Sequence, residues 1–96
     1  MEIKAKEVAD LLKIIANSNR LMVLCLLEEK RYTVSELNER IPGITMSALS
    51  QHLSSLKLAG LVKNEKCGMN VYYQIADLRI IEVIKVLKET YCRDSL

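Results

Sequence analysis

Cysteine and histidine are the side chains of this sequence best suited to covalent or metal chemistry, and both are scarce. The chain carries three cysteines, Cys25, Cys67 and Cys92, and a single histidine, His52. A cysteine thiolate attacks oxidants and persulfides and also binds soft metal ions, so sulfur chemistry is the first possibility to consider. The cysteines are odd in number and contain no Cys-x-x-Cys pair, unlike the disulfide framework of a secreted domain. We therefore expect thiols kept in a reducing compartment.

The rest of the composition predicts one small cytoplasmic domain over residues 1–96. No apolar run approaches the length of a membrane span, and the N-terminus mixes Glu and Lys with apolar residues instead of resembling a signal peptide. A chain of 96 residues buries a limited share of its surface, so a second subunit would add stability. There is no Gly-rich phosphate loop and no paired-carboxylate motif. We expect neither an enzyme nor a bound cofactor.

The net charge of +2 is small, but it comes from one region. Residues 1–44 hold seven Lys/Arg and seven Asp/Glu, and residues 76–96 hold four of each, so both flanks are neutral. Residues 45–75 contain three basic residues, Lys57, Lys63 and Lys66, and one acidic residue, Glu65. This localised excess is what a surface that contacts DNA phosphates requires, although a solvated face would tolerate it too.

Helical spacing and capping residues predict four helices before any strand. Apolar residues recur at helical intervals up to Ile15, and the Asn17-Ser18-Asn19 cluster separates that helix from a buried one over residues 20–27. Thr33 and Glu36 form a capping box for a short helix that ends near Arg40, before the turn at residues 41–44. Thr45 then caps a helix over residues 46–59, which Gly60 closes.

The helix over residues 46–59 has the composition of a DNA recognition helix. We expect its apolar residues to be buried: Met46, Leu49, Leu53, Leu56 and Leu58. The other side chains are short, polar and free of acid, and such side chains can bind phosphates and base edges in the major groove. An ordinary solvated helix would more often carry Glu/Lys pairs. The expected DNA-contacting residues on this element are Thr45, Ser47, Ser50, Gln51, His52, Ser54, Ser55 and Lys57.

A β-hairpin follows the predicted recognition helix. Leu61-Val62 opens a strand, Cys67-Gly68 supplies a turn, and residues 71–75 close the hairpin with strand-forming side chains. Lys63, Lys66 and Asn70 cluster towards its tip, where they are expected to contact neighbouring DNA backbone. The fold class is therefore mainly α with a small β-hairpin wing, a winged helix-turn-helix in the order α-α-α-α-β-β-α.

The first and last helices carry more apolar surface than one small core needs. The terminal helix extends from Leu78 to about Cys92, with Asp77 as its cap, and Val83 and Val86 widen its apolar stripe. A homodimer through both helices would place paired recognition helices on a palindromic double-stranded operator, while packing within one chain is the competing interpretation. The expected interface residues are Val8, Leu11, Leu12, Ile15, Ile80, Ile81, Ile84, Leu87 and Tyr91.

Four segments together resemble the ArsR family of bacterial repressors, over nearly the whole chain. They are Asn19-Arg20-Leu21-Met22-Val23-Leu24, Val34-Ser35-Glu36-Leu37, Ser47-Ala48-Leu49-Ser50-Gln51-His52-Leu53 and Gly60-Leu61-Val62, followed by a hairpin containing Tyr72-Tyr73. The resemblance implies a winged-helix homodimer that represses transcription until an inducer lowers its affinity for DNA.

The metal-binding patterns of the family are missing. Metal-sensing members carry paired cysteines in the helix before the recognition helix, where this chain has Glu36-Leu37-Asn38-Glu39. Others carry an Asp-x-His in the terminal helix, where Arg79 replaces the His. We therefore expect no metal site, and we interpret His52 as a packing or DNA-backbone residue.

The remaining cysteines resemble a subgroup of the family that senses oxidants or reactive sulfur, which includes the HlyU, BigR and SqrR regulators. In that subgroup a Cys in the second helix pairs with a Cys in a terminal aromatic-Cys segment, matched here by Leu24-Cys25 and Tyr91-Cys92. A disulfide or polysulfide bridge between them would shift the dimer and lower its DNA affinity. Cys67, at the wing turn, is expected to be incidental. The alternatives are a metalloid-responsive thiolate repressor, a constitutive DNA-binding protein, a protein-interaction winged helix, and structural cysteines.

Overall fold

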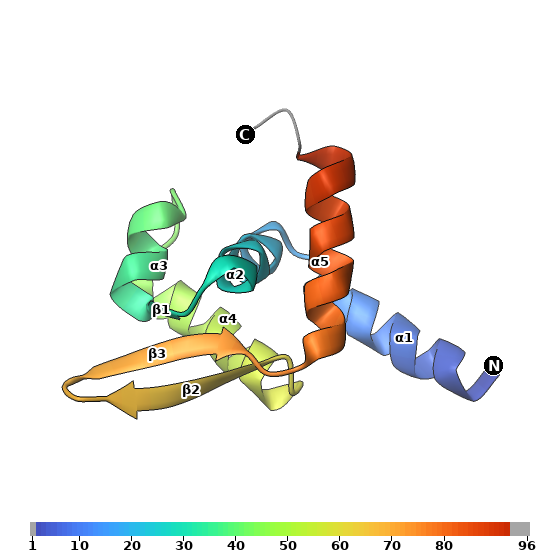
Figure 1. Ribbon diagram of the computed structural model, residues 1–96, viewed down its shortest axis with the longest axis horizontal. Helices are drawn as coiled ribbons and strands as arrows, with labels where there is room; N and C mark the ends of the chain where they lie inside the picture. The colour runs from blue at the N-terminus through green and yellow to red at the C-terminus, as the bar shows by residue number, and fades with distance from the viewer. Residues whose placement is uncertain (1, 93–96) are drawn as a thin grey trace.

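The computed structural model describes residues 2–92 as five helices and a small antiparallel sheet (Figure 1). The predicted order of four helices, a hairpin and a last helix is confirmed. One strand before the third helix was not predicted. The elements are α1 (Glu2–Ile15), α2 (Ser18–Glu29), β1 (Tyr32–Thr33), α3 (Val34–Arg40), α4 (Met46–Leu58), β2 (Val62–Cys67), β3 (Asn70–Ile75) and α5 (Leu78–Tyr91).

The predicted helix caps are all present. The side chain of Asn17 accepts hydrogen bonds from the backbone N–H groups at the start of α2. Thr33 and Glu36 form the reciprocal capping box of α3, with hydrogen bonds of 3.1 and 2.9 Å. The hydrogen bond from the Thr33 backbone N–H holds the pKa of Glu36 below its usual value. The side chains of Thr45 and Asp77 accept hydrogen bonds from backbone N–H groups in the first turns of α4 and α5, so local sequence signals set where these helices begin.

The sheet has the strand order β1-β3-β2. β2 and β3 pair along their full lengths from Val62↔Ile75 to Cys67↔Asn70, and β1 adds two residues opposite Tyr73 and Tyr72. The turn lies one residue later than predicted, because Cys67 ends β2 and Gly68 adopts a φ of 63°, which favours glycine. β1 ties the start of α3 to the hairpin.

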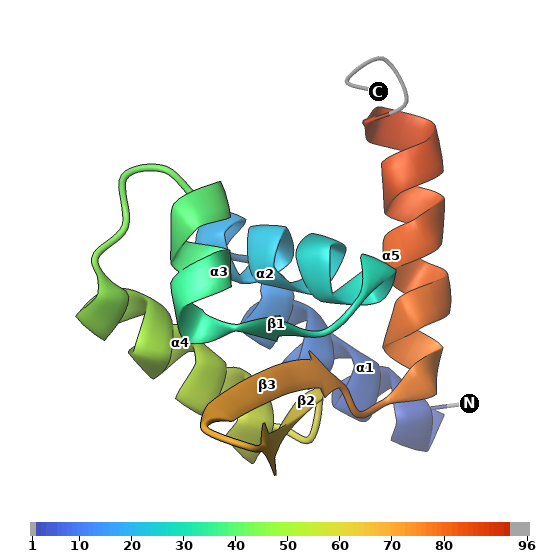
Figure 2. The same cartoon turned by 60° about the vertical axis from the view of Figure 1, so that its left-hand side comes forward.

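The core lies between α2 and the elements around it. Figure 2 shows α3 and α4 on one side of α2 and α5 on the other, and α2 contacts α1, α4, α5 and β3. The side chains with no exposed surface are all aliphatic: Val23, Leu24, Leu37, Leu49, Leu53, Leu56 and Ile84. Within the described residues, no helix has both the length and the apolarity needed to span a bilayer.

Two predicted core residues of α4 are instead on the surface. Met46 is 45% exposed and Leu58 is 92% exposed, whereas Leu49, Leu53 and Leu56 are fully buried. Met46 and Leu58 are the first and last residues of the helix. At both ends the helix extends past the elements that cover its middle, so apolar character there does not bring burial.

Candidate DNA-binding surface and cysteine pair

The helix-turn-helix consists of α3, the turn at residues 41–45, and α4. The side-chain amide of Asn38 on α3 donates a 2.9 Å hydrogen bond to the carbonyl of Ile44, which fixes the turn against α3. The hydroxyl of Thr45 then accepts from the backbone N–H of Ala48 at 3.1 Å. The three fully buried leucines of α4 anchor the helix, so its opposite face is held towards solvent in one orientation.

Most of the predicted recognition residues lie on that solvent face. Those that are exposed on α4 or at its cap are Thr45, Ser47, Ser50, Gln51, Ser54 and Lys57. Ser55 and His52 are half-buried. From Ser47 to Lys57 the exposed residues recur at intervals of three or four, which places them in one row along the helix. The row has no carboxylate to repel phosphate, and Lys57 gives it a positive charge.

His52 accepts a hydrogen bond from another residue of the chain, which the sequence did not reveal. Its Nδ1 accepts a 3.1 Å hydrogen bond from Nε of Arg20, which lies on α2. Nη1 of Arg20 also donates to the carbonyl of Ile14 on α1, at 3.0 Å. Arg20 and His52 are 32 residues apart in the sequence, and they meet only because α2 packs against α4. No local sequence pattern could have predicted this hydrogen bond.

The wing carries its polar residues in a different arrangement from the one expected. Lys66 and Asn70 lie next to the turn, but Lys63 pairs with Gln74 near the base of the hairpin. Lys63 and Lys66 are three positions apart along the strand, which separates their Cα atoms by roughly 10 Å. Since strand side chains alternate, they also point to opposite faces. The expected cluster of Lys63 with Lys66 at the tip is therefore wrong, although both lysines and Asn70 are exposed.

Arg31 is a further cation at the wing. Its guanidinium lies over the Tyr72 ring at 4.2 Å from the ring centroid, and Nη1 donates to the Cys67 sulfur at 3.3 Å. The Cys67 thiol also contacts Oε1 of Glu65 at 3.7 Å. Both of these contacts of the Cys67 sulfur are with residues at the wing. Arg31 was missed because its partners lie on the hairpin, far along the chain.

Cys25 and Cys92 lie at the end of the molecule where α2 meets α5. Lys88 of α5 donates from Nζ to the carbonyl of Cys25 at 3.2 Å and to carboxylates of Glu28 and Glu29, each at 3.0 Å. Cys92 follows one turn later, and its N–H donates to the carbonyl of Lys88 at 3.0 Å. Lys88 therefore connects the segments that carry the two thiols.

The two cysteines differ in exposure, and both are free thiols. Cys25 is half-buried in the α2–α5 contact, whereas Cys92 is exposed. Burial raises the pKa of the Cys25 thiol, the Lys88 ammonium acts in the opposite direction, and the charge of Cys92 adds to the rise. The hydrogen bonds of Lys88 to the carbonyl of Cys25 and from the N–H of Cys92 place the two cysteines on the same side of the α2–α5 contact.

The predicted dimer-interface residues fall into three groups by exposure. Ile15, Ile80 and Ile84 are at most 4% exposed within the single chain, so the expectation that they face a partner is wrong. They pack into the chain's own core, as the competing interpretation predicted. Still exposed are Val8 and Leu12 on α1 and Tyr91 on α5, together with Val83 and Val86. Leu11, Ile81 and Leu87 are partly buried against the core.

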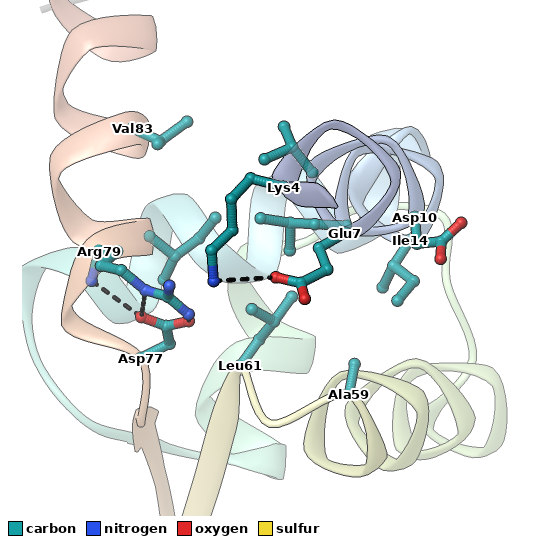
Figure 3. Close-up of a pocket in the computed structure, with 12 residues that line it drawn as sticks. Lys4, Glu7, Asp10, Ile14, Ala59, Leu61, Asp77, Arg79 and Val83 are labelled. Atoms are coloured by element: carbon teal, nitrogen blue, oxygen red, sulfur yellow. Dashed lines mark hydrogen bonds and ion pairs between the residues drawn. The ribbon is translucent and has the colours of Figure 1, made fainter. Parts of the chain in front are cut away.

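Part of this exposed surface forms a groove of about 570 Å³ between α1, the α4–β2 corner and the start of α5 (Figure 3). Val8, Leu11 and Val83 contribute to its apolar walls. At its rim Arg79 forms a bidentate ion pair with Asp77, with distances of 3.0 and 2.8 Å. In residues 2–92 there is no group of three or more His, Cys, Asp or Glu side chains suited to hold a metal ion.

The helix-turn-helix, its acid-free exposed helix and the hairpin after it define a winged helix-turn-helix protein. The sequence model for the bacterial regulatory protein arsR family matches residues 17–64, which span half of the chain. The chain belongs to the ArsR family.

Known relatives resemble this chain over almost its full length. The transcriptional activator HlyU of Vibrio cholerae is 37% identical over 97% of this chain and 85% of its own, and a structure of reduced HlyU superposes with a TM-score of 0.89 at 36% identity, covering 97% of both chains. The transcriptional repressor BigR of Xylella fastidiosa has a TM-score of 0.89 at 32% identity, over 100% of this chain and 94% of that one. The homodimeric winged helix-turn-helix domain Mb0332 of Mycobacterium bovis has a TM-score of 0.77 at 28% identity, covering 91% and 80%.

Proposed function

We propose that this ArsR-family regulator acts as a homodimeric repressor that binds a palindromic operator and releases it when a bridge forms between Cys25 and Cys92. One observation carries the switch: Lys88 donates to the carbonyl of Cys25, and the N–H of Cys92 donates to the carbonyl of Lys88, so the α2–α5 contact brings the two cysteines to the same end of the molecule. The inducer would be a small oxidant or an organic persulfide.

The DNA-binding part of the proposal rests on the exposed face of α4 and on the wing. The α4 row of Ser47, Ser50, Gln51, Ser54 and Lys57 would enter the major groove, with Thr45, His52 and Ser55 at its margins. Lys63, Lys66 and Asn70 would contact backbone on either face of the wing.

A dimer would bring two such surfaces onto successive half-sites. Mb0332 is named as a homodimer, and α1 and α5 of this chain leave apolar side chains exposed beside the groove of Figure 3. We propose that Val8, Leu11, Leu12, Ile81, Leu87 and Tyr91 face the partner. Val8 and Leu12 are 50% and 52% exposed and Tyr91 is 79% exposed, and apolar side chains left exposed on a small domain favour a second copy as their cover.

The sulfur chemistry follows from the difference in exposure. The exposed Cys92 thiolate would attack the outer sulfur of an organic persulfide, release the organic thiol and become a persulfide itself. The Cys25 thiolate would then attack the inner sulfur, form the Cys25–Cys92 disulfide and release hydrogen sulfide. A bridge that retains extra sulfur would need further persulfide. Closing the bridge would join the end of α5 covalently to α2, and α5 belongs to the proposed dimer surface.

The test is intact mass and peptide mapping of the reduced protein after treatment with an organic persulfide, with binding to promoter DNA from upstream of its own coding sequence measured in parallel. We expect a Cys25–Cys92 crosslink, weakened DNA binding, and no response in Cys25→Ser or Cys92→Ser. Cys67→Ser is the matched control and should respond like the wild type. DNA release without a crosslink would reject the switch, and a Cys67→Ser protein that no longer responds would favour a thiolate site that recruits the wing.

A further inference from the structure

Arg20 joins three helices through one guanidinium group. Nε donates to Nδ1 of His52 on α4 at 3.1 Å, and Nη1 donates to the carbonyl of Ile14 in the last turn of α1 at 3.0 Å. Arg20 itself sits in the first turn of α2, where its backbone N–H donates to the Asn17 cap at 3.1 Å. A cation at the C-terminal end of α1 also offsets the partial negative charge of the helix end.

The contact determines which nitrogen of His52 can act as a donor. Because Nδ1 accepts a hydrogen bond from a guanidinium, it carries no proton, and the ring proton is on Nε2. Among the described residues, no hydrogen bond involves Nε2 of His52. Every fully buried side-chain nitrogen or oxygen of those residues has a partner, so Nε2, which has none, is not fully buried. Nε2–H is therefore accessible. His52 stands between the exposed Gln51 and the buried Leu53, at the margin of the α4 row.

We propose that Arg20 is a positioning residue for operator recognition. It holds the His52 ring so that Nε2–H donates to a phosphate of the operator backbone, and it fixes α4 relative to α1. This inference rests on the proposed function, because α1 is part of the proposed dimer surface. Through Ile14 and His52, Arg20 helps to set the separation of the two recognition helices in the dimer, and hence the half-site spacing that the protein accepts.

Two substitutions at His52 separate the phosphate contact from the Arg20 contact. In His52→Asn, the side-chain oxygen can still accept from Arg20 near the former Nδ1 position, but no donor reaches as far as Nε2. In His52→Gln, the longer amide can donate from near the Nε2 position, but Arg20 no longer has its acceptor. At Arg20 itself, Arg20→Lys retains the charge without the fork that reaches both partners, and Arg20→Gln removes both features.

The experiment measures operator binding by fluorescence anisotropy, after footprinting has located the two half-sites in the promoter DNA upstream of the gene. Each variant is titrated with the natural operator and with one that contains an extra base pair between the half-sites. Thermal unfolding of each variant without DNA identifies any loss of the fold. The comparison requires that the wild type binds the natural operator. If the wild type does not bind, the proposed function is rejected together with the role proposed for Arg20.

We expect His52→Asn to weaken binding to both operators equally, by about tenfold, as the removal of one hydrogen bond to phosphate predicts. Arg20→Lys, Arg20→Gln and His52→Gln should instead lose preference for the natural spacing. The double variant Arg20→Gln, His52→Gln should be no worse than Arg20→Gln alone, because the contact that His52→Gln breaks is already lost in Arg20→Gln. Folded Arg20 variants that retain the affinity and spacing preference of the wild type would overturn the proposal, as would additive effects in the double variant.

Discussion

Lys88 is the residue whose replacement most directly tests how α5 is held against α2. Its ammonium donates to the Cys25 carbonyl and to Glu28 and Glu29, and the side chains of Lys88 and Glu28 are only 19% and 16% exposed. Burial alone would lower the pKa of Lys88, but hydrogen bonds to the two carboxylates raise it above its usual value. The raised pKa means that the interaction contributes fully at neutral pH and disappears only as the pH rises through that value.

Lys88→Met retains the aliphatic stem and removes the charge, so the change is confined to these hydrogen bonds. Hydrogen bonds to charged groups contribute about 1.5–3 kcal/mol where they are shielded, while the exposed pair with Glu29 adds less than about 1 kcal/mol. We expect a decrease of about 1–3 kcal/mol in the free energy of unfolding. For a domain of this size, each kcal/mol lowers the Tm by about 4–8 °C.

The same variant should also slow the bridging of Cys25 and Cys92. Lys88 opposes the rise in the pKa of Cys25, so its removal leaves less thiolate at neutral pH. The assay follows thermal unfolding of the reduced protein and the rate of crosslinking across a pH series, where the deficit should shrink at alkaline pH. Lys85→Met, at an exposed position of the same helix, is the control. A Lys88→Met protein that unfolds and crosslinks like Lys85→Met would refute the reasoning.

Three further predictions test the core, the wing and the last helix. Leu53→Ala should cost about 2–5 kcal/mol in denaturant unfolding because Leu53 is fully buried, whereas Leu58→Ala, at a position 92% exposed, should unfold like the wild type. Lys63→Ala and Lys66→Ala should each weaken binding to all DNA sequences alike and reduce the salt slope by about 0.9 for each phosphate that is no longer neutralised, and an unchanged slope would exclude a phosphate contact at that lysine. The side-chain hydrogen bond from Arg79 lowers the pKa of the Asp77 carboxyl. The wild type should therefore be more stable than Asp77→Asn by a margin that is complete above about pH 4 and declines as the pH falls further. A pH-independent difference between Asp77→Asn and the wild type would contradict this.

Local signals predicted the starts of the helices well. The caps at Asn17, Thr33, Thr45 and Asp77 need only a side-chain oxygen close in sequence to free backbone N–H groups, so they can be recognised without the fold. The strand β1 gave no such signal, because two residues cannot display alternation and their pairing partners lie on the distant hairpin.

Periodicity predicted apolar faces but not what covers them. Ile80 and Ile84 were expected at a subunit interface and instead pack within the chain, while Leu58 was expected in the core and is exposed. The interactions of Arg20 with His52 and of Arg31 with Cys67 were missed for the same reason. Each joins residues that become neighbours only through the packing of α2 or β1, and no pattern in a single sequence encodes that proximity.

The helix α2 carries two interactions that matter for the proposed function and that the sequence did not reveal. They are the Arg20–His52 hydrogen bond and the Lys88 contact with Cys25. Arg20, in the first turn of α2, connects to the recognition helix and to α1, while Cys25 and Glu28, towards its end, connect to α5 through Lys88. α2 also places Val23, Leu24 and Leu27 in the core, where close packing resists bending of the helix. A bridge between Cys25 and Cys92 would therefore act on the same element that orients His52. If both proposals hold, disrupting the hydrogen bond between Arg20 and His52 should reduce the effect of the sulfur bridge on DNA affinity without preventing the bridge from forming.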